Sequence, residues 1–216
     1  MANVFQILAK LSGGVGGALA ELKADREGGL LVSHSLPRYT EITRRGGGWS
    51  LMNTAALAAL VIRPSTLSNF TLFNNNPSGS DLCYIIDRAF AFNLVSTAAQ
   101  ARSGLWLCVH PPGLVTPAND ITARASSSGK VTANEANAMG DTNMTVTDDG
   151  WFPWGPWSDV EPTGVLPGAI MVAEIEGRLI VPPQCGISTQ VVSGVVGNTF
   201  TSGFSFYVQK LKLGAD

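Results

Sequence analysis

Histidine is the residue type that most often binds metals or acts as a general base, and it is scarce in this 216-residue sequence. The two histidines are His34 and His110, and neither has a second His, Cys or carboxylate at the spacing of a metal site. A Ser-His-Asp site would have to use one of them, and the sequence contains no GxSxG nucleophile motif. We predict that His110, which precedes Pro111-Pro112 at a strand end, is a hydrogen-bonded loop histidine.

The three cysteines, Cys83, Cys108 and Cys185, form no CxxC pair. Cys83 and Cys108 stand inside apolar, strand-like runs, where a free cysteine usually behaves as a small hydrophobic residue. An odd and unclustered set of cysteines argues against a disulfide framework. We therefore expect synthesis in a reducing cytoplasm.

Two stretches resemble ligand-binding loops and fail on their spacing. The stretch that starts at Asp141 lacks the Gly at the sixth position and the Glu at the twelfth, which is Phe152, so a turn at Asp148-Asp149-Gly150 is favoured over a calcium loop. The glycines at 13–17 follow no long strand, carry no GK[ST], and precede Leu19 where a dinucleotide fingerprint has Gly. We predict a protein that is not an enzyme and uses no metal or cofactor.

An aromatic cluster is the other chemical feature of the sequence. Trp151, Trp154 and Trp157 fall within seven residues, close to several acidic residues. Aromatic rings beside carboxylates can bind sugars, and aromatic residues are also favoured anchors of protein interfaces. The sequence leaves three roles open for these tryptophans: a carbohydrate platform, a subunit contact, or a cap on the fold.

The composition indicates a large core and a surface with few charges. Hydrophobic residues make up 45% of the chain and charged residues only 14%, against roughly a quarter in ordinary soluble domains. A net charge of −2 offers no basic footprint for nucleic acid. The longest apolar run, Ala55–Ile62, is too short to span a bilayer, and the first run, Val4–Ala9, is too short for a signal peptide. We expect neither a nucleic acid nor a membrane as a partner.

The stretch 82–95 predicts the central strand of the fold. At period two, Phe90 and Phe92 share one face, whereas a helix would place them on nearly opposite sides. Fourteen residues is long for a strand, so we expect a bend or a bulge near Asp87–Ala89. The last strand is expected at 200–213, with Phe200, Phe204, Phe206 and Val208 on one face. We also expect Phe90 and Phe92 to be buried against Phe204 or Phe206 of this strand.

The remaining pattern predicts an antiparallel β-sandwich over residues 51–216, resembling a jelly roll. The sandwich carries a long turn-rich insertion at about 113–168. A weak helix can form within this insertion, at 132–139. Glu176-Gly177 is predicted to be the tight turn of a hairpin. Residues 1–50 read as an extended N-terminal arm with two short helical stretches between glycine-rich breaks. The apolar residues of this arm need a partner surface, and they are Val4, Phe5, Ile7, Leu8, Leu11, Leu19 and Leu22.

The stretch 51–213 resembles the small β-sandwich structural proteins of tailed bacteriophages. The resemblance rests on the glycine-rich arm, on neutral strands rich in Ala, Ser, Thr and Gly, and on the pattern of 174–183 followed by Phe204-Ser205-Phe206-Tyr207-Val208. It implies a virion protein assembled in the host cytoplasm, such as a capsid decoration (cement) protein that binds the major capsid protein or another virion protein. It also implies a homo-oligomer, with a trimer favoured. A receptor- or carbohydrate-binding tail module is the alternative.

Overall fold

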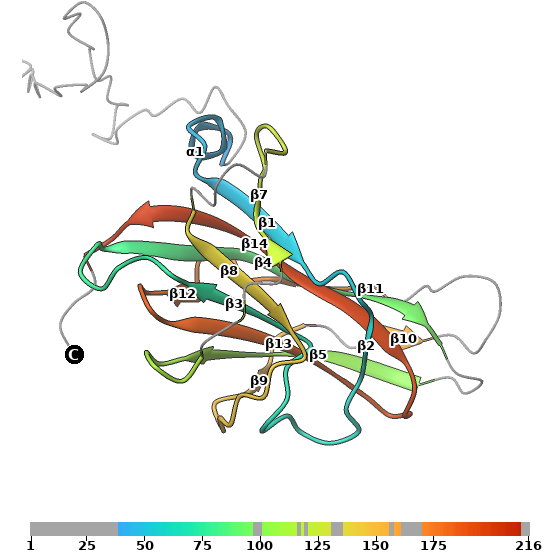
Figure 1. Cartoon of the computed structure of the whole chain (residues 1–216). Helices are drawn as coiled ribbons and strands as arrows, with labels where there is room; N and C mark the ends of the chain where they lie inside the picture. Colours follow the sequence, from blue (N-terminus) through green and yellow to red (C-terminus); the bar gives the residue numbers. More distant parts are fainter. Residues whose placement is uncertain are drawn as a thin grey trace, which may run out of the picture. The chain divides into compact units, whose positions relative to one another are not determined.

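In the computed structural model the chain forms two compact units, Met1–Arg38 and Tyr39–Asp216. The residues described below all belong to the second unit (Figure 1). The predicted helical stretches of the arm and its seven apolar residues fall outside the described part. A short helix, α1 (Thr40–Arg44), precedes the first strand, and Tyr39 stacks on Tyr207 with ring centroids 4.9 Å apart. The described residues are 39–96, 101–115, 118, 121–130, 136–155, 158–160 and 170–212.

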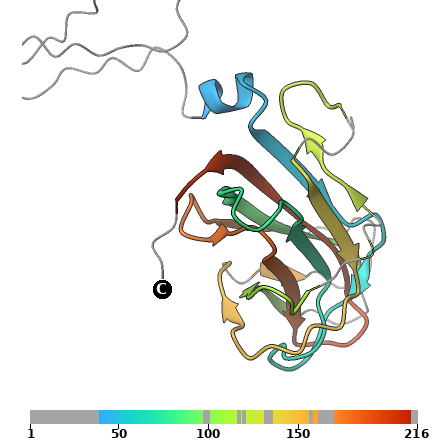
Figure 2. The ribbon, with the colours of Figure 1, turned by 60° about the vertical axis from the view of Figure 1, so that its left-hand side comes forward.

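The described chain is mainly β and forms two antiparallel sheets, which Figure 2 shows as two layers. Sheet 1 has the order β11-β4-β14-β1-β7, with β12 also on β4 and β2 also on β14. Its strands are β1 (Gly48–Met52), β2 (Leu57–Ala58), β4 (Leu82–Val95), β7 (Arg124–Ala125), β11 (Ile170–Glu174), β12 (Ile180–Val181) and β14 (Thr199–Lys210). The predicted antiparallel β-sandwich is therefore confirmed at this level.

Sheet 2 has the order β10-β5-β13-β3-β8-β6, with β9 also on β5. Its strands are β3 (Phe70–Asn74), β5 (Ala101–His110), β6 (Ile121–Thr122), β8 (Ala138–Thr142), β9 (Phe152–Pro153), β10 (Ser158–Val160) and β13 (Gly186–Ser193). The stretch 113–168 thus contributes strands to both sheets. The weak helix considered at 132–139 is wrong for its described end, because Ala138 and Met139 begin β8 and pair with β3.

The longest strand, β4, has the predicted bounds and the predicted bulge. Ser205 of β14 pairs with Arg88, but the next residue, Phe206, pairs with Ile86. Asp87 is therefore an extra residue on β4, and β14 runs past it without interruption. One extra residue on one strand reverses which face its later side chains occupy.

This reversal moves Phe90 and Phe92 of β4 out of the core. Before the bulge the even-numbered residues of β4 face the core, whereas after it odd-numbered residues such as Ala89 do, with none of its surface exposed. Phe90 and Phe92 are consequently only half-buried, on the outer face of sheet 1. The prediction that they are buried against Phe204 or Phe206 is wrong.

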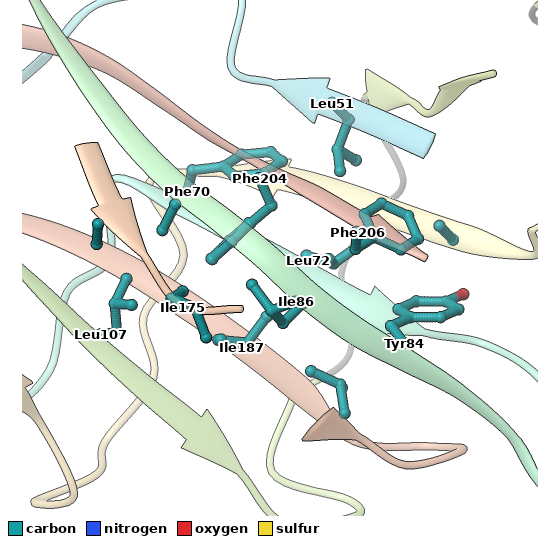
Figure 3. Packing of buried hydrophobic residues seen from close by; sticks show 14 of the residues in the cluster. Leu51, Phe70, Leu72, Tyr84, Ile86, Leu107, Ile175, Ile187, Phe204 and Phe206 are labelled. Atoms are coloured by element: carbon teal, nitrogen blue, oxygen red, sulfur yellow. The ribbon is translucent and has the colours of Figure 1, made fainter. Parts of the chain in front are cut away.

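The core lies between the sheets and takes its aromatic residues from Tyr84, which precedes the bulge on β4, and from other strands (Figure 3). β14 keeps strict alternation, so Phe200, Phe204 and Phe206 all point inward and are at most 1% exposed. Phe204 faces Phe70 of sheet 2 with ring centroids 6.0 Å apart, and Phe206 contacts Tyr84 at 4.7 Å. The face of β14 predicted from its periodicity is thus confirmed.

The turn at Glu176-Gly177 forms, but it does not connect a hairpin. Both residues have positive φ (51° and 80°), and the Arg178 amide donates to the Ile175 carbonyl, as in a tight turn. However, β11 and β12 pair one after the other with the same edge of β4, and not with each other. The hairpin prediction is wrong because the long edge of β4 offers both strands a partner.

No helix in the described part of the chain is both long enough and apolar enough to cross a membrane. The one regular helix there, α1, has five residues. Its Glu41 carboxylate bonds the guanidinium groups of Arg44 and Arg45 on the surface. The helix is therefore a short polar segment that precedes β1.

Candidate functional site

A chain of hydrogen-bonded side chains lies on the outer face of sheet 2, where the segment 143–151 packs against it. His110 is the last residue of β5, and Ser188 lies in the neighbouring strand β13. The His110 Nε2 atom is 2.8 Å from Ser188 Oγ, and its Nδ1 atom is 2.7 Å from Asp148 Oδ2. Asp148 comes from the packed segment, so three separate parts of the chain build a Ser-His-Asp arrangement.

The chain of hydrogen bonds continues through two more hydroxyl groups. Ser188 Oγ is 2.7 Å from Thr71 Oγ1, which is 2.8 Å from Ser68 Oγ. An ionised carboxylate only accepts, so His110 Nδ1 carries the proton that Asp148 accepts, and Nε2 accepts from Ser188. Thr71 then donates to Ser188, and Ser68 donates to Thr71. In this arrangement His110, Ser188 and Thr71 each donate once and accept once, while the Ser68 proton is used for the 2.8 Å bond to Thr71 and not for the longer 3.3 Å contact with the Met144 carbonyl.

The electrostatics of the network keep its members in those protonation states. Burial lowers the pKa of His110, although Asp148 acts in the opposite direction, so the imidazole is neutral. Burial acts to raise the pKa of Asp148, but hydrogen bonds from His110 and from the Gly150 amide outweigh it and lower that pKa. Burial and the Asp148 charge raise the pKa of Cys108 to about 12, so the thiol is protonated.

The geometry matches that of a nucleophilic serine, but the serine is closed off. Ser188 and His110 have no exposed surface, and Cys108 is 2% exposed. A substrate carbonyl cannot reach Ser188 Oγ, which already donates to His110 Nε2 and accepts from Thr71 Oγ1. The network instead joins the segment 143–151 to β5, β13 and β3.

Cys108, His110 and Asp148 also present one ligand atom each within 4.8 Å of one another. Two ligands of one tetrahedral zinc ion lie roughly 3.3 Å apart, given zinc–nitrogen and zinc–oxygen bonds of about 2 Å. The distance of 2.7 Å between His110 Nδ1 and Asp148 Oδ2 is shorter than this ligand–ligand distance and is that of a hydrogen bond. The spacing in this cluster therefore fits a hydrogen-bonded network better than a metal centre.

The prediction for His110 is correct in its hydrogen bonding and in its place at a strand end, and wrong in assigning it to a loop. The residue ends a strand and is buried, and it does not lie in a loop. Its partner Cys108 was detectable, since residues i and i+2 of a strand share a face. Asp148 is 38 positions away in the sequence, and no local pattern connects it to His110. The turn predicted at Asp148-Asp149-Gly150 is confirmed, because Asp148 Oδ1 accepts the Gly150 amide at 2.8 Å.

The tryptophan cluster is only partly a surface. Trp151 is 1% exposed and meets His110 edge-on at 5.9 Å, so its ring is not available to a partner. Trp154 is half-buried, with the Arg178 guanidinium 5.4 Å from its ring centre. Trp157 is outside the described residues. An apolar groove of about 670 Å³ lies beside Trp154, and exposed Phe152 lines it as well.

A second apolar feature covers the outer face of sheet 1, and we call it the apolar face. In register across the sheet, Ile170 lies opposite Phe92, and Val172 lies opposite Phe90. Phe90 in turn lies opposite Gly203, which lies opposite Met52 on β1. Exposed fractions reach 59% for Ile170 and 44% for Met52. The apolar face is defined by Met52, Phe90, Phe92, Ile170 and Val172.

This sequence matches no protein-family model, and it has no significant match among curated proteins. Within the described residues, Ser188, His110 and Cys108 are buried in the hydrogen-bonded network, while the side chains of the apolar face lie on the outer side of sheet 1.

Proposed function

We propose that this protein is a non-enzymatic structural protein of a bacteriophage virion, of the capsid decoration (cement) kind. In this role it binds the major capsid protein or another virion protein through its N-terminal arm. It self-associates through a β-sandwich with jelly-roll topology, and a trimer is favoured. It is assembled into the particle in the host cytoplasm.

The apolar face is the observation that carries this proposal. Monomeric soluble proteins seldom expose a contiguous apolar patch of this kind unless a partner covers it. Here Ile170 and Val172 of β11, Phe90 of β4 and Met52 of β1 lie in register across four adjacent strands, and Gly203 of β14 lies between the last two. A protein whose task is to pack against copies of itself and against a larger particle needs such a face.

The buried network supports the non-enzymatic half of the proposal. Ser188, His110 and Asp148 have the order of a catalytic triad, yet the serine has no exposed surface and is bonded on both sides. An active nucleophile must meet its substrate within van der Waals contact. The network instead stabilises the segment 143–151 on sheet 2.

Removing residues 1–38 tests the tether, because the unit with the sandwich begins at Tyr39. We expect the truncated protein to keep its thermal unfolding transition but to lose co-sedimentation with expanded capsids of the phage that encodes it. The seven apolar residues of the arm are then no longer present to bury against the capsid. The full-length protein is the control. Undiminished co-sedimentation of the truncated protein would place the attachment site on the sandwich.

A receptor- or carbohydrate-binding tail module is the second candidate, and the groove beside Trp154 favours it. Phe152 is 63% exposed there, and an aromatic side chain on a groove wall can stack on a sugar ring. For this function, Trp154→Ala would abolish binding on a glycan array and leave oligomerisation unchanged. No bound glycan for the wild-type protein would remove this candidate.

A further inference from the structure

We infer that the apolar face binds a second copy of this chain, and that the ridge on one half of the face enters a groove on the other half. The ridge consists of Ile170, Val172 and Phe92, and the groove lies beside Phe90 and Met52. This inference rests on the self-association in the proposed function and names the surface that performs it.

The ridge is built by the edge strand β11 and by the part of β4 that follows the bulge. Ile170 and Val172 alternate outward on β11, opposite Phe92 and Phe90. Without the extra residue Asp87, the two phenylalanines would point into the core and the ridge would be lost. The bulge therefore creates an apolar surface that the stability of a single copy does not require.

The groove has a volume of about 460 Å³ and opens between β1 and Thr122, with Phe90 and Met52 in its lining. Gly203 separates Phe90 from Met52 in the register and contributes no side chain. A Cβ atom there would lie 2.6 Å from Met52 Cβ and would also clash with the Leu51 carbonyl. Glycine at this position lets β1 approach β14 closely enough for Met52 to reach the groove beside Phe90.

The charges on this face favour a second copy over a nucleic acid or an anionic membrane. Arg88 Nε bonds Glu174 Oε2 at 2.8 Å, and Asp87 lies 3.9 Å from the same guanidinium nitrogen. Arg124 stands at the groove. Opposite charges thus lie side by side, without the single-sign field that attracts nucleic acid or an anionic membrane. With an apolar ridge, an apolar groove and both signs of charge, the ridge of each copy can enter the groove of the next, and head-to-tail contacts of this kind close into rings.

The ridge contact is tested with Ile170→Lys in the full-length protein. Ile170 is 59% exposed, so a lysine there leaves the single copy folded but places a charge in the contact. By sedimentation velocity we expect wild type to be a closed oligomer, and the variant to associate at least about tenfold more weakly. Ile62→Lys is the matched control, since Ile62 is 67% exposed and precedes Arg63, which bonds the Trp151 carbonyl on the sheet 2 side. Equal association of both variants and wild type would overturn the inference, as would a monomeric wild type.

Cross-linking tests the pairing of ridge with groove. The three native cysteines are free and buried, so single surface cysteines can be addressed by a short bis-maleimide. Mixing Ile170→Cys protein with differently tagged Thr122→Cys protein should give a cross-linked pair of two different copies. Replacing Ile170→Cys by Ile62→Cys in the mixture should not. Absence of the first product from oligomeric protein would overturn the ridge–groove contact.

Capsid co-sedimentation separates this inference from the proposed function. Wild type that binds capsids, together with an Ile170→Lys variant that still associates fully, would overturn the inference and leave the virion role standing. Wild type that binds no capsid, together with a dissociated Ile170→Lys variant, would support the inference and overturn the virion role.

Discussion

Replacing Phe204 by alanine will lower the free energy of unfolding by about 3–5 kcal/mol, which is the usual cost of removing a fully buried phenylalanine. Phe204 has no exposed surface and packs on Phe70 across the two sheets. A cavity at this position removes contacts from both layers at once. Urea denaturation, monitored by tryptophan fluorescence at a concentration below that of self-association, measures the loss.

Phe90→Ala is the matched control for that measurement. Phe90 is on the outer face because of the bulge at Asp87, and it is only half-buried. We expect a loss of about 1 kcal/mol in the single copy, corresponding to part of the area of the ring. Losses of equal size for the two variants would mean that β4 has no bulge and that Phe90 is a core residue.

Replacing His110 by glutamine will cost about 1–3 kcal/mol at pH 7.5 and will also remove a pH dependence of stability. The substitution leaves buried Ser188 and part of Asp148 without their partner. Because burial lowers the pKa of His110 below its ordinary value of 6.5, the unfolded chain binds a proton there before the folded protein does. Wild-type stability therefore falls as the pH drops below about 6.5, and the variant loses this slope.

The other titratable groups around the His110 imidazole do not change their protonation between pH 7.5 and 5. The lowered pKa of Asp148 also favours the folded state, but that contribution is lost only as the pH falls below its ordinary value of 3.8. Cys108, which touches the same carboxylate, has its pKa raised and stays protonated throughout. Urea unfolding between pH 7.5 and 5 isolates the histidine. His34→Gln is the matched control, and a slope that disappears in this variant instead would contradict the assignment to His110.

The periodicity of the sequence was sufficient for β14 and insufficient for β4. Phe200, Phe204 and Phe206 alternate along an uninterrupted strand, so the face that they occupy follows from sequence spacing alone. On β4 the bulge was predicted near Asp87, but the reversal of Phe90 and Phe92 depends on its position to a single residue. The ladder to β14 determines that position, and no local preference of β4 does.

At Glu176-Gly177, too, the local sequence determined the turn, whereas the tertiary structure determined the strand pairing. Two consecutive residues of positive φ are a local property, and the sequence was enough to place the turn. Which strands pair after the turn is a competition between edges. The edge of β4 is long enough to take both β11 and β12, so the hairpin does not form.

The sequence by itself determined the fold class, the long strand with its bulge, and the alternation of the C-terminal strand, because each depends on side-chain period or local backbone preference. Only the tertiary structure decided that His110, Ser188 and Asp148 meet, and that Ile170, Phe90 and Met52 share one face. These residues are 38 or more positions apart within each group. Contacts over such separations follow from strand order and register, which result from the packing of the whole sandwich and have no local signature.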